Sequence, residues 1–111
     1  MQIAREVATL AQMAREGNLT SGQTQGGTFS ISSLGGIGGT GFTPIINAPE
    51  VAILGAARAD HKPKWDGTRF EPRLMLPLYL SWDHRVVDGA AAARFLGYLG
   101  VLLADFRRAL L

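Results

Sequence analysis

The apolar positions in the first part of the chain predict a helix followed by a polar loop. Between Gln2 and Glu16 the apolar residues recur at intervals of four and three and so share one helix face: Ile3, Val7, Leu10 and Ala14. Gly17 and Asn18 end this pattern in the way that is typical of a helix C-terminus. Residues 18–27 are polar and rich in glycine, so we expect a loop there.

The middle of the chain shows the patterns of strands. Thr28–Ser33 alternates between apolar and polar residues, and Val51–Arg58 is a continuous apolar run of the kind found in strands that are buried on both faces. Asp66-Gly67 is a strong hairpin signal. Pro72–Asp83 predicts a longer strand with four leucines on one face, Leu74, Leu76, Leu78 and Leu80. Pro77 inside it indicates a bulge or a sheet edge, because proline has no N–H to donate to a neighbouring strand.

The last segment, Gly89–Leu111, predicts a second helix, with Asp88 at the position of its N-cap. Alanines open it, and a stripe of large apolar residues follows: Phe95, Leu99, Leu102, Leu103, Phe106 and Leu110. A chain of 111 residues is long enough for one domain only. We therefore expect one α+β domain, a mixed β-sheet with the first and last helices packed against it.

Residues 34–50 form an irregular, glycine-rich connection with a short extended piece at Ile45-Ile46. Gly36–Gly41 matches the dinucleotide-binding pattern G-x-G-x-x-G, which has to open a helix so that amide N–H groups meet the pyrophosphate. Residues 42–49 contain two prolines and β-branched residues, which disfavour a helix. We therefore interpret these glycines as positions where backbone segments cross closely.

Composition narrows the classes of function. The chain is 47% hydrophobic, and its formal net charge of +2 is too small to indicate binding to nucleic acid or to a membrane. It has no cysteine, which excludes disulfides, thiolate metal sites and a cysteine nucleophile, and agrees with a reducing compartment such as the cytoplasm. We expect no metal. The helical pattern begins already within Met1–Arg5, so we expect the chain to be part of a longer protein.

His84 is the strongest candidate for chemistry. It lies between an apolar strand and a helix, a junction that often exposes catalytic side chains on rigid elements, and its neighbours include Asp83, Arg85 and Asp88. A histidine there is suited to act as a general base near neutral pH. The same residues also suit a purely structural turn, in which Asp88 is only a helix cap and His84 a hydrogen-bonded turn residue. His61 lies in a charged segment that we expect to be a solvated loop.

A hydroxyl partner for this base is available in the predicted strand that ends at Ser33. Ser32 and Ser33 are the candidates, but neither lies in the G-x-S-x-G turn of serine hydrolases. A site with a histidine base and a serine that donates to an oxyanion needs fewer catalytic residues than a serine-hydrolase triad, because the nucleophile then comes from the substrate.

The segment His84–Gly89 has the sequence HRVVDG and resembles the H-R-x-x-D-G signature of the dihydrolipoamide acyltransferases, the core components of 2-oxo acid dehydrogenase complexes. Residues 26–55 and 72–96 extend this resemblance over nearly the whole chain and look most like the acetyl-transferring, pyruvate dehydrogenase branch of the family. The resemblance implies the fold of chloramphenicol acetyltransferase. Since that catalytic domain is longer, it also implies that residues 1–111 are its C-terminal part, truncated at the N-terminal side.

The resemblance implies transfer of an acetyl group between a dihydrolipoyl thioester and coenzyme A. His84 matches the base that takes the proton from the coenzyme A thiol, and Ser32 matches the serine that stabilises the oxyanion, with Ser33 as the adjacent alternative. Asp88 matches the residue that holds the geometry of the site together with an arginine. No residues are assigned to coenzyme A binding. Tyr79 and Trp82 stand where smaller or other aromatic residues are more familiar in the family.

The resemblance also implies partners: a homotrimer with histidine and serine from neighbouring chains, larger assembly of trimers into a core, a lipoyl domain and the other 2-oxo acid dehydrogenase components. Two alternatives stand beside it. One is a non-catalytic folding or assembly fragment that keeps the motif but is inactive alone. The other is an enzyme that acetylates a small hydroxylated acceptor, which residues 32–55 argue against.

Overall fold

The computed structural model describes residues 1–110 of the chain. Within this range the helices are α1 (Gln2–Arg15) and α2 (Gly89–Ala104), with short 3-10 helices η1 (Ser21–Gln23), η2 (Gly35–Ile37) and η3 (Phe106–Leu110). The strands are β1 (Ser30–Ser33), β2 (Ala52–Ala56), β3 (Asp60–Trp65), β4 (Phe70–Met75) and β5 (Leu78–Trp82). No helix among these residues is both long enough and apolar enough to cross a membrane.

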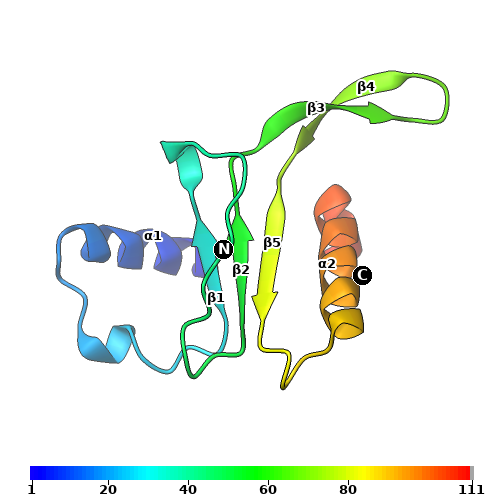
Figure 1. Ribbon diagram of the computed structural model, residues 1–111. Helices are drawn as coiled ribbons and strands as arrows, with labels where there is room; N and C mark the ends of the chain where they lie inside the picture. The colour runs from blue at the N-terminus through cyan, green and yellow to red at the C-terminus, as the bar shows by residue number, and fades with distance from the viewer. Residues whose placement is uncertain (111) are drawn as a thin grey trace.

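A three-stranded mixed sheet with the order β1-β2-β5 forms the centre of the molecule (Figure 1). β1 runs parallel to β2 with Ser32 opposite Gly55, and β5 runs antiparallel to β2 with Tyr79 opposite Gly55. β2 pairs on both sides, and Ile53 and Leu54 are each only 7% exposed. The continuous apolar run therefore predicts this buried strand correctly, and the expected α+β class with a mixed sheet is confirmed.

α2 covers one face of this sheet (Figure 1). Side chains in neighbouring strands that pair in register point to the same face, and alternate residues of a strand point to opposite faces. The face toward α2 carries Leu80 and Trp82, which line an apolar cavity with Ala92 and Phe95 of the helix. Phe29, just before β1, reaches the same helix, because its ring centroid lies 6.0 Å from that of Phe95.

β3 and β4 form a separate two-stranded hairpin that projects from one end of the sheet (Figure 1). The hairpin expected at Asp66-Gly67 is confirmed: Trp65 pairs with Phe70, and the Asp66 N–H donates to the carbonyl of Arg69 at 3.0 Å. His61 lies in β3 and not in a loop, although its exposure to solvent is as expected.

The single strand predicted over residues 72–83 is wrong. The chain leaves the hairpin after Met75 and enters the central sheet at Leu78, so four leucines that alternate in sequence do not share one face. Pro77 lies at the break, and its carbonyl accepts from the Ala57 N–H at 3.1 Å. Since proline has no N–H, the ladder is interrupted where the chain passes from one sheet to the other.

α1 does not pack against the sheet as the apolar stripe predicted. None of its residues is buried, Ile3 is 79% exposed and Val7 is 60% exposed. The helix extends away from β1 (Figure 1). The periodicity is correct for a helix, but an apolar face can be covered by any surface of suitable shape, and sequence periodicity does not say which.

One further boundary differs from the expectation. The final helix is interrupted at Asp105, whose extended backbone (φ −143°, ψ 90°) ends α2, and η3 follows. Ile45-Ile46, expected as a short extended piece of the irregular connection, belongs to no strand of the sheet. The tip of the predicted final helix, Leu111, lies outside the described residues.

Gly55 is a position of β2 where a side chain would not fit. A Cβ atom placed there would lie 2.7 Å from the Cζ atom of Phe42, whose ring covers the sheet face opposite α2. The requirement is spatial, because the neighbouring atoms belong to a packed aromatic ring. Within the glycine-rich connection, a Cβ at Gly41 would collide with the Tyr79 hydroxyl, whereas one at Gly38 would meet nothing within 4 Å, so the expected close crossing is found at Gly41 and not at Gly38.

We predict that Gly55→Ala destabilises the protein by about 1–3 kcal/mol, the usual cost of forcing an extra group into packed space. Gly97→Ala is the matched control, since a Cβ at that helical position meets nothing within 4 Å and alanine favours a helix. Urea denaturation of both variants measures the difference. Equal stability of Gly55→Ala and the wild type would contradict the packing.

Candidate functional site

The backbone of the turn between β5 and α2 is fixed by hydrogen bonds at its first residue. The N–H of Asp83 donates to the carbonyl of Val51 at 2.7 Å, which extends the pairing of β5 with β2 by one further bond. The carbonyl of Asp83 then accepts from the N–H groups of Val86 and Val87, each at 3.0 Å. His84 lies inside this tight turn, so its backbone position follows from the sheet.

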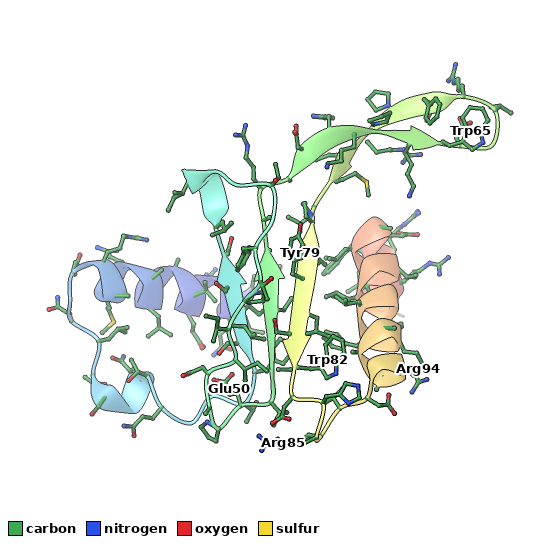
Figure 2. The ribbon with its side chains drawn as sticks, viewed as in Figure 1. Glu50, Trp65, Tyr79, Trp82, Arg85 and Arg94 are labelled. Atoms are coloured by element: carbon green, nitrogen blue, oxygen red, sulfur yellow. The ribbon has the colours of Figure 1, made fainter. Side chains whose placement is uncertain are left out.

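The side chain of Asp83 adds a second constraint. Its carboxylate accepts from the Arg85 backbone N–H at 3.0 Å and from the Arg85 guanidinium at 2.7 Å. These side-chain and backbone hydrogen bonds from Arg85 lower the pKa of Asp83 from 3.8 to about 2. Asp83 and Arg85, the residues on either side of His84, are therefore held together by these hydrogen bonds; Figure 2 shows Arg85 at this turn.

The imidazole of His84 is exposed and faces Trp82. The two ring centroids lie 6.3 Å apart at an interplanar angle of 36°. Trp82 itself lies between β5 and α2, where its indole Nε1 is buried and has no hydrogen-bond partner among the described residues (Figure 2). Its ring also lines the apolar cavity of about 160 Å³ beneath the turn. Sequence reasoning noted Trp82 only as a departure from the family and gave it no role.

Asp88 is the N-cap of α2, as the sequence predicts. Its Oδ1 atom accepts from the Ala91 N–H at 2.7 Å, which satisfies one of the free donors of the first helical turn. Among residues 1–110 it forms no ion pair, so the arginine that the family resemblance places beside it is not found within the described part of this chain. The cap lies four residues after His84 and fixes the start of α2 at Gly89.

Ser32 and Ser33 differ in what their hydroxyl groups do. The Ser33 hydroxyl accepts from the Gly35 N–H at 3.1 Å and so belongs to the local turn before η2. Ser30, two residues earlier, donates to Glu50 at 2.7 Å. The Ser32 hydroxyl takes part in none of the hydrogen bonds within residues 1–110, and its residue is half-buried. Accepting a hydrogen bond does not use the proton of the Ser33 hydroxyl, so both serines can still donate. They differ in the face of the sheet on which they lie: Ser32 lies in register with Gly55 and Tyr79, and Ser33 lies on the opposite face in register with Ala56 and Leu78.

The structure does not bring Ser32 and His84 together within one chain. Ser32 shares a sheet face with Gly55 and Tyr79, whereas Trp82, the ring beside His84, points to the opposite face toward α2. β1 and β5 are separated by β2, so the two strands lie about 10 Å apart. Tyr79 and Trp82 are also well separated along β5 (Figure 2). A hydrogen-bonded pair of these two groups within one chain is therefore excluded.

The sheet face with Ser32 is covered by the segment Thr40–Pro44. The Tyr79 hydroxyl donates to the carbonyl of Thr40 at 3.1 Å, and the Ser81 hydroxyl donates to the carbonyl of Pro44 at 2.6 Å. Phe42 lies between these two anchors. Sequence reasoning missed this cover; the only signal was the glycine-rich composition of residues 34–50.

No nucleotide site forms at the glycine pattern. η2 ends at Ile37, and within the described residues no α-helix follows before Gly89, so there is no helix N-terminus to meet a pyrophosphate. Two cations, Arg58 and Lys62, share a hollow of about 180 Å³ with Thr40 and Asp60. The two cations exceed the one carboxylate of Asp60, so this hollow offers positive charge to an anionic ligand. No group of side chains within residues 1–110 has the arrangement of a metal site.

Comparison with known proteins assigns the chain to a family. The model of the 2-oxoacid dehydrogenases acyltransferase catalytic domain matches residues 1–111. The chain belongs to the 2-oxoacid dehydrogenase acyltransferase family. The chain is 66% identical over 111 residues to the dihydrolipoyllysine-residue acetyltransferase component of the pyruvate dehydrogenase complex of Cupriavidus necator, and 63% identical to that of Pseudomonas aeruginosa. Each alignment covers 100% of this chain and 20% of the relative, so the chain spans about a fifth of the length of those proteins.

Solved structures agree with this membership. The dihydrolipoamide acetyltransferase of Azotobacter vinelandii superimposes with a TM-score of 0.95 at 64% identity, over 99% of this chain and 45% of that one. A cubic core of the pyruvate dehydrogenase multienzyme complex gives a TM-score of 0.95 at 63% identity, over 99% and 45%. The expected acyltransferase fold is thereby confirmed.

We predict that Arg85→Gln raises the pKa of Asp83 toward its ordinary value but not fully to it, because the backbone N–H at residue 85 still donates. A carboxyl group whose pKa is lowered by folding stabilises the folded state above its unfolded pKa, and this contribution is lost as the pH falls from 3.8 through about 2. Carboxyl NMR titration measures both pKa values. Arg107→Gln, which removes the similar partner of Asp105, should leave Asp83 unchanged. An unshifted Asp83 in Arg85→Gln would contradict these hydrogen bonds.

Proposed function

We propose that the protein containing this chain transfers an acetyl group between a dihydrolipoyl thioester and coenzyme A, with His84 of one copy and Ser32 of a neighbouring copy in each site. The observation that carries this proposal is the separation of the two groups within one chain: Ser32 lies in β1 on the face of Gly55 and Tyr79, and His84 lies in the turn after β5 beside Trp82. Among residues 1–110 neither side chain has a hydrogen-bond partner, and His84 is exposed while Ser32 is half-buried, which suits groups that are completed by another chain.

The chemistry follows from the two side chains. His84 takes the proton from the coenzyme A thiol, because the thiolate is the nucleophile and a free thiol is mostly protonated at neutral pH. The thiolate attacks the carbonyl carbon of the acetyl-dihydrolipoyl thioester, and the Ser32 hydroxyl donates to the resulting oxyanion. When the tetrahedral intermediate collapses, the lipoyl sulfur leaves and takes the proton from His84.

The Azotobacter vinelandii acetyltransferase supports these assignments. That enzyme is described by the roles of a serine, a histidine 52 residues later and an asparagine 4 residues after the histidine in its catalytic mechanism. Ser32 and His84 are likewise 52 residues apart here, and Asp88 follows 4 residues later. The third position therefore carries a carboxylate in this chain where that enzyme has an amide.

The assembly that we propose is a homotrimer, built into a larger core, that receives lipoyl domains and the other components of a 2-oxo acid dehydrogenase complex in the cytoplasm. The likeness to a cubic core supports repeated subunits. The exposed apolar side chains of α1 and α2 give the chain surfaces that need partners, among them Ile3 (79% exposed) and Tyr98 (67%). The hollow of Arg58 and Lys62 offers positive charge for phosphate groups of coenzyme A.

The same exposed surfaces favour a second candidate for the isolated chain, a fragment that keeps the site residues but is inactive alone. A chain that supplies half of a site cannot turn over substrate as a monomer. Its size by light scattering therefore has to accompany every measurement of its activity.

Complementation between two variants of the full-length protein tests the shared site. We expect His84→Ala to lower acetyl transfer by about 10²–10⁴-fold and Ser32→Ala by about 10²–10³-fold, with folding and assembly intact. Mixed trimers assembled from equal amounts of the two variants should recover about a quarter of the wild-type activity, because a head-to-tail ring pairs an intact histidine with an intact serine at that frequency.

The control is each variant refolded alone by the same procedure, which should recover nothing. Mixed trimers without activity would contradict the shared site. Full activity of His84→Ala alone would contradict the base.

Substitutions of Asp88 distinguish its role as the helix cap from any role of its negative charge. Asp88→Asn should keep both the stability and most of the acetyl transfer, because asparagine caps helices as well as aspartate does. Asp88→Ala should lose about 1 kcal/mol of stability and part of the activity. Thermal unfolding and steady-state assays measure the two effects. A loss of transfer in Asp88→Asn as large as in His84→Ala would show that the charge is required.

A further inference from the structure

The ring of Phe42 lies beside the proposed oxyanion donor. Ser32, Gly55 and Tyr79 form one row across the three strands and point to the same face of the sheet. The Cζ atom of Phe42 lies where a Cβ of Gly55 would be, and the ring centroids of Phe42 and Tyr79 are 6.1 Å apart. The ring of Phe42 therefore fills the position next to Ser32 that the missing side chain of Gly55 leaves open.

The backbone on both sides of Phe42 is held in place. On one side Thr40 accepts from the Tyr79 hydroxyl, and a Cβ on Gly41 would collide with that hydroxyl, so the chain passes closely over Tyr79. On the other side Pro44 is buried and accepts from Ser81 at 2.6 Å. Two anchors within two residues of Phe42 fix the backbone from which its ring extends over Gly55.

We propose that Phe42 determines acyl-chain length in the transfer reaction, by closing the apolar space beside the Ser32 hydroxyl so that acetyl fits and longer acyl groups do not. This inference rests on the proposed function, because it needs the thioester oxygen at Ser32. Ser32 lies one strand spacing from Gly55, so an acyl chain that extends toward β2 from a carbonyl bound by that hydroxyl meets the ring.

The chemistry at this position favours selection by size. The atoms that border the space are an aromatic ring and a glycine, which offer no hydrogen bond to a polar acyl group. A ring packed against Gly55 and Tyr79 occupies the space that added methylenes would need, and one methylene typically changes specificity by about 10–200-fold. The residue that decides chain length is therefore ten positions after Ser32 and outside the HRVVDG segment.

Acyl-chain preference of the full-length protein tests this role. The kcat/KM for acetyl-, propionyl- and butyryl-coenzyme A is measured with dihydrolipoamide as acceptor, for the wild type, Phe42→Ala and the milder Phe42→Leu. We expect the butyryl-to-acetyl ratio of kcat/KM to rise at least about 10-fold in Phe42→Ala, with a smaller rise in Phe42→Leu. If Phe42→Ala does not fold, the rise in Phe42→Leu carries the test.

Phe29→Ala is the matched control, because Phe29 packs against Phe95 of α2 on the opposite face of the sheet. It should lower stability and leave the ratio unchanged. An unchanged ratio in a folded Phe42 variant, or an equal rise in Phe29→Ala, overturns the inference.

Ser32→Ala shows whether a negative result contradicts only the role of Phe42 or also the role of Ser32. If it lowers transfer of every acyl group while the Phe42 variants keep the wild-type ratio, only the role of Phe42 is wrong. If it leaves transfer unchanged, the proposed function of Ser32 is wrong as well.

Discussion

The pairing of β2 with a strand on each side is the constraint on which the arrangement of reactive groups depends. Residues in register across the sheet share a face. Gly55 at the centre therefore places Ser32 on one side of it and Tyr79 on the other, all on the same face. On one face Ser32 lies beside the space that Phe42 fills. The other face packs against α2. It presents Trp82, whose ring lies beside the ring of His84. A fixed backbone ladder thus separates two groups whose chemistry is complementary.

The turn that follows β5 places His84, the base that we propose, without using its side chain in the fold. Backbone bonds to Asp83 and the carboxylate bonds to Arg85 hold the turn, while the Asp88 cap starts the next helix. His84 carries none of these interactions. Its imidazole is therefore free to exchange a proton, and replacing it removes no contact that holds the turn. This separation of structural and chemical roles is what a positioned base requires.

The chain exposes large apolar residues on α1, α2 and the hairpin, and buries few side chains fully. Such surfaces are rare on monomers and usually mark interfaces. They agree with a site divided between copies, in which the interface that buries apolar surface also brings the histidine of one chain to the serine of another. Assembly and chemistry would then depend on the same surfaces.

Periodic local patterns were enough to predict the buried strand β2, the hairpin at Asp66, the two helices and the cap at Asp88, because each depends on neighbours within a few residues. The HRVVDG segment and the family resemblance of residues 26–55 and 72–96 were likewise enough to propose the reaction. An irregularity at Pro77 was predicted from its missing N–H, but not that the chain passes there from one sheet to another. The packing of α1 and the interrupted C-terminal helix were not predicted, because they depend on which surfaces are available to cover an element.

The sequence by itself determined which residue types the chain offers for acyl transfer and the local elements that carry them. Only the tertiary structure decided that Ser33 is engaged in a turn, that Ser32 and His84 lie apart, and that Phe42 covers Gly55. The physical reason is that strand register is a long-range property. It brings residues that are 13 to 52 positions apart into contact or separates them, and no local pattern encodes that choice.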